Sequence, residues 1–204
     1  MSDANNILDF SDFKEDTITQ DIVEEKLGEK EIENIKDIII PNSVIVIGKE
    51  TFSECESLTS LKFPNSVEII EDGAFRYCES LISLTIPNSV IVIGKETFLG
   101  CESLTSLTIP DSVKMIAESA FFGCDALTSL IIPNSVKHIS ERAFQFCNSL
   151  TSLSIPDSVT VIGVETFNKC SSLTSLKLGN SVRSRSEEHT SELQSRQYLV
   201  CRLL

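Results

Sequence analysis

The sequence predicts a solenoid, a stack of coils in which each coil adds one short strand to a parallel sheet. The main observation is a 23-residue repeat that occurs six times over residues 41–178. Proline, phenylalanine and cysteine all recur at this period. The recurring residues are Pro41, Pro64, Pro87, Pro110, Pro133 and Pro156; Phe52, Phe75, Phe98, Phe121, Phe144 and Phe167; and Cys55, Cys78, Cys101, Cys124, Cys147 and Cys170. A repeat this short cannot bury its apolar side chains alone, so it folds only by stacking on its neighbours.

The negative charge of the chain is concentrated at its N-terminal end. The formal net charge is −13, and residues 1–40, with 12 acids and four lysines, account for −8 of it. The repeats are therefore only mildly acidic, and neither part has the basic patch that binds nucleic acid or an anionic membrane. The sequence contains no run of 18 apolar residues, so it predicts no membrane span. The first 30 residues lack the pattern of a signal peptide, which leaves two interpretations open: a cytoplasmic chain, or a fragment whose export signal lies outside it.

The first 40 residues predict a cap for the solenoid. Residues 1–17 are acidic and predicted to be mobile, although Phe10 and Phe13 could dock on the first coil. Residues 18–40 copy the apolar spacing of the repeats imperfectly. We interpret them as a degenerate capping repeat, because the outermost coil must present a polar face to water.

Within this cap, residues 19–28 predict a short helix. Thr19 is suited to the N-cap, and Gly28 lies where a helix commonly ends. The apolar side chains expected to face inward are Ile22, Val23 and Leu27.

Each full repeat predicts two extended segments. Residues 60–63 (SLKF) alternate polar and apolar side chains, as a half-buried strand does. The proline that follows cannot donate to a ladder and ends the strand, and the Asn-Ser pair after it favours a turn. Residues 67–70 then return as a second extended segment on the opposite side, and residues 74–78 close the coil at helical or 3₁₀ spacing.

The stretch Ile86 to Pro110 (IPNSVIVIGKETFLGCESLTSLTIP) resembles the BspA-type leucine-rich repeat. The resemblance covers residues 41–178 and implies a leucine-rich-repeat solenoid, a β-rich α/β fold. Parallel strands would lie on its concave face, and short extended or 3₁₀/helical segments on its convex side. Similar family members are mostly surface or secreted proteins of bacteria and some parasitic protists, linked with adhesion and host-protein binding. The resemblance implies non-enzymatic recognition of a protein or another macromolecule.

The outward positions of the predicted strands form the candidate binding face. They are Ser60, Lys62, Ser83, Thr85, Ser106, Thr108, Ser129, Ile131, Ser152, Ser154, Ser175 and Lys177. Solenoids bind extended partners along such surfaces. The alternative is structural: small hydroxyls simply solvate a parallel sheet and form hydrogen bonds along their own ladder.

The six periodic cysteines predict a buried ladder of thiols that pack as small apolar groups. A zinc site would need closely spaced cysteines with histidines, and the chain has only His138 and His189. Stacked side chains about 4.8 Å apart are too parallel for disulfides, although an oxidant-induced bridge remains an alternative. No catalytic, phosphate-binding or dinucleotide motif occurs. We therefore predict no catalytic residue, no metal and no cofactor.

The repeat breaks down at the C-terminal end. Residues 179–184 keep part of the pattern, with Gly179 in place of the next proline. Residues 185–204 begin RSEEHTSELQS, which we interpret as the translation of a sequencing adapter; a genuine tail is the alternative. The last coil would then have an open edge, where solenoids could stack end to end. This suggests a second function, that of a self-assembling structural solenoid or an intracellular scaffold, possibly a fragment of a longer protein.

Overall fold

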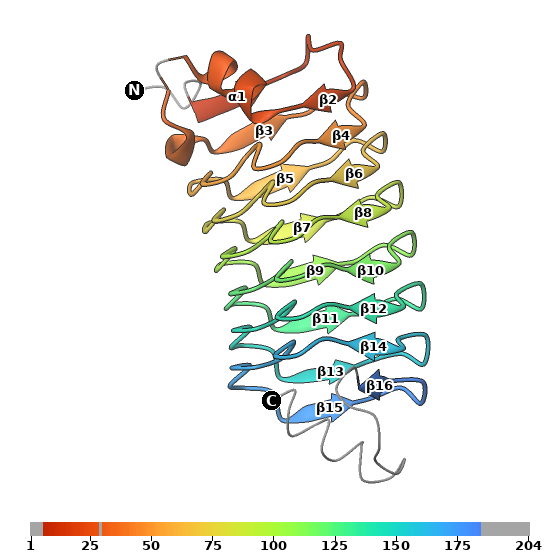
Figure 1. Cartoon of the computed structure of the whole chain (residues 1–204). Helices are drawn as coiled ribbons and strands as arrows, with labels where there is room; N and C mark the ends of the chain where they lie inside the picture. The colour runs from red at the N-terminus through yellow and green to blue at the C-terminus, as the bar shows by residue number, and fades with distance from the viewer. Residues whose placement is uncertain (1–5, 29, 185–204) are drawn as a thin grey trace.

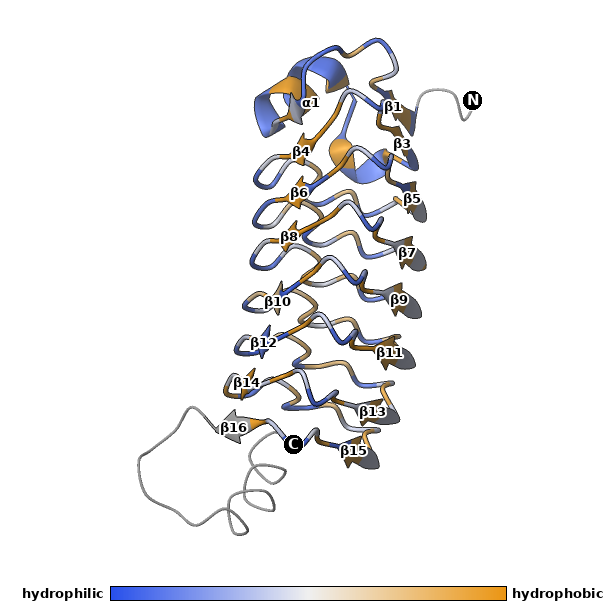
Figure 2. Cartoon of the chain, turned by 90° about the vertical axis from the view of Figure 1, so that its right-hand side faces the viewer, coloured by the Kyte–Doolittle hydropathy of each residue, from blue (hydrophilic) through white to orange (hydrophobic). Residues whose placement is uncertain are grey.

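Parallel strands form two columns on opposite sides of the chain, one strand of each column per coil (Figures 1 and 2). The structure is a computed structural model that describes residues 6–28 and 30–184. The first column contains β1 (Ile7–Asp9), β3 (Asp37–Ile39), β5 (Ser60–Lys62), β7 (Ser83–Thr85), β9 (Ser106–Thr108), β11 (Ser129–Ile131), β13 (Ser152–Ser154) and β15 (Ser175–Lys177). The second column contains β2 (Thr17–Ile18), β4 (Val46–Ile47), β6 (Ile69–Ile70), β8 (Val92–Ile93), β10 (Met115–Ile116), β12 (His138–Ile139), β14 (Val161–Ile162) and β16 (Arg183–Ser184).

The register of the strands confirms that one 23-residue repeat makes one coil. Leu61 pairs with Leu84 and Leu84 with Leu107, so identical repeat positions become neighbours. The second column follows the same rule, with Ile47 opposite Ile70 and Ile70 opposite Ile93. The predicted solenoid with parallel strands is therefore confirmed.

A third line of hydrogen bonds joins the coils where each coil closes. The backbone N–H of Phe52 donates to the carbonyl of Ala74 at 2.9 Å, and equivalent bonds follow in later coils. The expected 3₁₀ spacing is present as single turns, such as the bond from the Arg76 N–H to the Gly73 carbonyl at 3.0 Å. No helix forms between residues 40 and 184, because two positions of each closing segment, for example Glu50 and Glu54, have positive φ.

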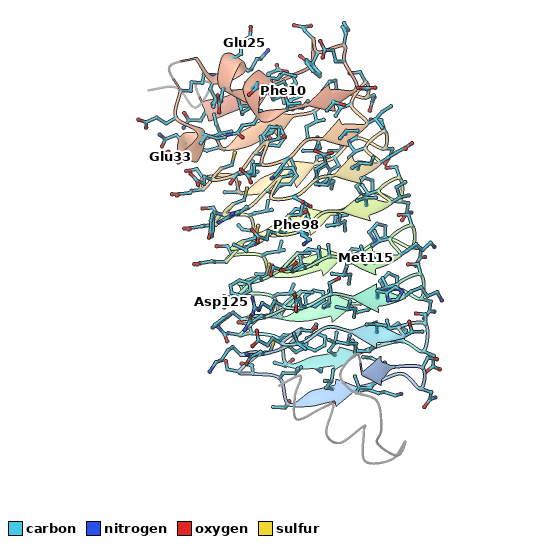
Figure 3. All side chains as sticks on the ribbon, in the orientation of Figure 1. Phe10, Glu25, Glu33, Phe98, Met115 and Asp125 are labelled. Carbon is cyan, nitrogen blue, oxygen red and sulfur yellow. The ribbon has the colours of Figure 1, made fainter. Side chains whose placement is uncertain are left out.

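The interior is a set of ladders built from the repeat positions. The six periodic phenylalanines are fully buried and stack, with ring centroids 5.4–5.8 Å apart. Figure 3 labels Phe98, one of these six residues. Parallel rings at this spacing gain contact energy beyond the apolar area that they bury. The ladder therefore holds the coils, and the faces they carry, in fixed register.

The N-terminal cap contains the expected helix. Helix α1 (Gln20–Leu27) has Thr19 at its N-cap and Gly28 at its C-cap, and it buries Val23 against the core. A 3₁₀ turn, η2 (Ile32–Asn34), leads into β3. No helix in the described part of the chain is long and apolar enough to cross a membrane.

The structure differs from the sequence-based expectation in residues 6–17. Strand β1 pairs with β3, so the solenoid begins before residue 18. The docking of Phe10 considered from the sequence is confirmed: Phe10 is buried, with its ring 6.1 Å from that of Phe52 and 6.2 Å from that of Phe13. The physical reason is that the exposed end of the phenylalanine ladder is apolar, and Phe10 covers it. Residues 185–204 lie outside the described residues, so the adapter interpretation and end-to-end stacking stay predictions.

Candidate binding surface

The outer side of the first column carries the twelve candidate residues, and we call this surface the hydroxyl face. Its members are Ser60, Lys62, Ser83, Thr85, Ser106, Thr108, Ser129, Ile131, Ser152, Ser154, Ser175 and Lys177, and all of them are exposed. They alternate with inward leucines, which are buried from Leu61 to Leu153. The alternation arises because successive side chains of a strand point to opposite sides of the sheet.

The strand serines of successive coils are in register. Ser83 lies opposite Ser60 and Ser106, and Ser106 lies opposite Ser129. The hydroxyl ladder considered from the sequence forms one residue earlier instead: the Thr105 hydroxyl donates to the Ile82 carbonyl at 3.1 Å. Within residues 6–28 and 30–184, the hydroxyls of the strand serines have no such partner, so they can donate to and accept from a bound molecule.

A shallow depression lies beside the hydroxyl face. Ile131 is 76% exposed there, the highest value among the exposed large apolar side chains of the described residues. The depression has a volume of roughly 380 Å³. Its lining includes Thr108 and Ile131, with Asn88, Asp111 and Asn134 along its edge. The sequence placed Ile131 on this face but did not predict the depression, which forms only when turns 23 residues apart are stacked.

The second column has a groove that the sequence did not predict. Its volume is roughly 700 Å³, and its lining includes Val92, Met115, His138 and Val161. The signal available in the sequence was weak: each repeat has two variable positions between its recurring valine and isoleucine, and these positions are apolar in several coils. Figure 3 labels Met115 on this side of the molecule.

The six periodic cysteines are buried and free. Each thiol from Cys78 onward donates to the carbonyl of a phenylalanine in the preceding coil, as Cys101 does to Phe75 at 3.5 Å. Burial raises the pKa of Cys101 to about 12. Cys170 is the exception, because a hydrogen bond with the Cys147 side chain lowers its pKa. A buried neutral thiol is a poor nucleophile and metal ligand.

The described residues contain no group of three or more His, Cys, Asp or Glu side chains placed to hold a metal ion. His138 lies exposed on β12, in the second column. His189 and Cys201 fall outside the residues that the structure describes.

Comparison with solved structures gives bacterial leucine-rich repeat proteins. The leucine-rich repeat protein of Treponema pallidum is 26% identical, with a TM-score of 0.65 over 78% of this chain and 77% of that one. A leucine-rich cell surface protein of Faecalibacterium prausnitzii is 25% identical, with a TM-score of 0.61 over 76% of this chain and 58% of that one. A leucine-rich repeat protein of Eubacterium ventriosum, 23% identical with a TM-score of 0.59, shares the fold over 75% of this chain and 44% of its own length.

No curated protein matches the chain. The family model for the BspA-type leucine-rich repeat region matches residues 30–148 and 92–197, with six copies. These two matches overlap and together span most of the chain, including all six repeats. The chain therefore belongs to the BspA-type leucine-rich repeat family.

Proposed function

We propose that this chain is a non-enzymatic recognition module that binds a protein partner through the hydroxyl face. The observation that carries the proposal is the row of unpaired strand serines, from Ser60 to Ser175, at one outer position of six successive coils. A serine hydroxyl can both donate and accept. A row of them, one per coil at a spacing of about 4.8 Å, can therefore form hydrogen bonds at several points along a segment laid along the solenoid.

Ile131 is the natural anchor of such a complex. Protein interfaces place an apolar centre inside a polar rim, and here an exposed isoleucine is surrounded by Ser129, Thr108 and the polar edge of the depression. Burying an isoleucine side chain contributes about 1.5–3 kcal/mol. Ile131 would thus supply affinity, while the hydroxyls supply orientation.

The biological setting that we propose is recognition at a cell surface, in the manner of an adhesin. The similarity to a cell surface protein of F. prausnitzii supports it. The chain spans 58% of that protein, so the partners and the mode of anchoring of that protein are not attributed to this chain.

The test is selection of binding peptides and comparison of variants. Random peptides displayed on phage are selected against the immobilised full chain, and the affinities of enriched peptides are measured by biolayer interferometry. We expect the Ile131→Thr substitution to weaken binding by about tenfold, since part of the burial energy is lost. Thr85 and Thr108 occupy the same position in β7 and β9, so the fold tolerates threonine there.

A bulky charge tests the serine row itself. Ser106→Arg combined with Ser129→Arg should abolish peptide binding, whereas Met115→Glu on the opposite column should leave it unchanged. Unaltered binding by the double arginine variant, or a failure of any peptide to enrich, would contradict the proposed role of the hydroxyl face.

A further inference from the structure

The outer side of the second column is apolar where the first is hydroxylated. Nine large apolar side chains are exposed in the described part of the chain, and five of them lie on this side: Ile45, Ile91, Val92, Met115 and Val164. Val92 and Met115 are 46% and 51% exposed. Figure 2 shows the hydrophobic colouring along β4, β6, β8 and β14. Such a concentration on one side marks an interaction surface.

This surface has a ridge and a groove running side by side across four coils. We define the ridge as Val92, Met115, His138 and Val161; Met115, His138 and Val161 are paired in register. The groove floor, two residues further along each coil, consists of Gly94, Ala117, Ser140 and Gly163. The outer wall of the groove consists of Lys95, Glu118, Glu141 and Val164. The open volume of the groove, roughly 700 Å³, leaves room for side chains from another molecule. At Gly94 and Gly163 a Cβ would collide with the backbone of the neighbouring coil, so these two glycines allow the coils to pack closely.

The two flanks of this surface carry opposite charges in the two central coils. Lys114 and Lys137 are exposed just before the ridge, and Glu118 and Glu141 lie on the outer wall of the groove in the same coils. Glu118 pairs with Lys95 at 2.8 Å. Among residues 6–28 and 30–184, neither Lys137 nor Glu141 has an ion-pair partner.

We propose that the partner on this surface is a second copy of the chain, bound side by side about a two-fold axis parallel to the solenoid. This axis exchanges the two flanks of the surface while keeping each coil level with its counterpart. The ridge of one copy then faces the groove of the other, and Lys137 faces Glu141 of the partner subunit. An axis running across the solenoid would instead place ridge on ridge and lysine on lysine. Shape and charge therefore select the same axis, as an isologous dimer requires.

The charges also limit the extent of the dimer. In the coil before the ridge, Glu68 would face an acidic residue, Asp72, across the axis, so the contact begins at the following coil. Four coils at about 4.8 Å per step give a contact about 15–20 Å long. A contact this short buries a small surface area, at the low end of the range for specific interfaces. The dimer should therefore be weak and reversible.

Sedimentation velocity of the full chain tests the proposal. Between about 2 and 200 µM, the range in which weak interfaces associate, the wild-type chain should shift from monomer to dimer. Met115→Glu should remain monomeric throughout. Ile131→Glu is the matched control: it adds the same charge to an exposed apolar strand position in the other column, and should dimerise as the wild type does.

A charge exchange tests the predicted axis. Lys137→Glu should weaken dimerisation, because two acidic side chains would then face each other, and Lys137→Glu combined with Glu141→Lys should restore it. A wild-type chain that stays monomeric at the highest concentration would overturn the proposal. So would dimerisation unaffected by Met115→Glu, loss of the dimer in the Ile131→Glu control, failure of the exchange to restore pairing, or growth beyond a dimer, which end-to-end stacking would produce.

Discussion

Replacing Phe121 with alanine tests whether the phenylalanine ladder couples the coils. The Phe121 ring is fully buried and stacks between those of Phe98 and Phe144, each centroid 5.4 Å away and the planes within 9° and 4° of parallel. Removing a buried phenylalanine side chain costs about 3–5 kcal/mol. Each stacked pair lost adds about 0.5–1.5 kcal/mol beyond the area effect, so Phe121→Ala belongs at the upper end of this range.

Phe167 supplies the matched control. It is equally buried, but among the described residues its only ring neighbour is Phe144, at 5.8 Å. Phe167→Ala should therefore cost less than Phe121→Ala by about one stacked pair, roughly 0.5–1.5 kcal/mol. Phe121→Leu, which keeps much of the apolar volume and removes only the ring, should fall between the wild type and the alanine variant.

The assay is urea unfolding followed by circular dichroism, because the chain has no tryptophan. The free energy of unfolding is compared for the wild type and the three variants. Two outcomes would refute the argument that stacked rings hold the coils in register. One is that Phe167→Ala lowers the free energy of unfolding as much as Phe121→Ala or more. The other is that Phe121→Ala lowers it by less than about 1 kcal/mol, well below the cost of an ordinary large-to-small substitution in a core.

Three further predictions concern buried groups and turns. Since burial raises the pKa of Cys101 to about 12, the stability provided by its neutral thiol is complete below about pH 8.5 and is lost as the pH rises from there toward the folded-state value. The destabilisation caused by Cys101→Ala, measured by urea unfolding under reducing conditions, should therefore shrink by about 2 kcal/mol between pH 8 and pH 10. Gly100→Ala should lower the melting temperature more than Gly123→Ala: both glycines have φ near +70°, but only at Gly100 would a Cβ lie 2.5 Å from the Tyr77 ring. Thr97→Val should cost about 1 kcal/mol in urea unfolding, because the buried Thr97 hydroxyl bonds to two backbone carbonyls at 2.8 and 3.2 Å.

Each of these predictions has an outcome that would contradict it. A cost of Cys101→Ala that is independent of pH would mean that the thiol ionises as readily in the folded chain as in the unfolded one. Equal melting temperatures for the two glycine variants would mean that the Tyr77 ring moves aside without cost. If Thr97→Val left the free energy of unfolding unchanged, the two carbonyls would have found other donors. The site accepts an apolar side chain sterically, because Ala74, Ala120 and Ala143 occupy the same repeat position.

The periodic sequence could predict most of the fold because each coil repeats one local pattern. Proline ends the strand, alternation separates Leu107 from Ser106 and Thr108, and phenylalanine and cysteine mark the interior. These features depend on residues close together in the chain. The same alternation placed the residues of the hydroxyl face on one side, although their role in binding stays a prediction.

Stacking decided the features that the sequence could not predict. Positive φ at Tyr77, Ser119 and Arg142 is unusual for such residues, and it accompanies the hydrogen bonds that join each closing segment to the next coil. Strand β1 joins the solenoid only because the edge of β3 is open to it. The ridge and groove of the second column likewise join side chains that lie 23 residues apart. The sequence by itself thus determined the path of one coil and the burial of its side chains. The surfaces available for binding were decided by tertiary structure, because stacking alone makes distant residues neighbours and sets which charges and apolar groups share a face.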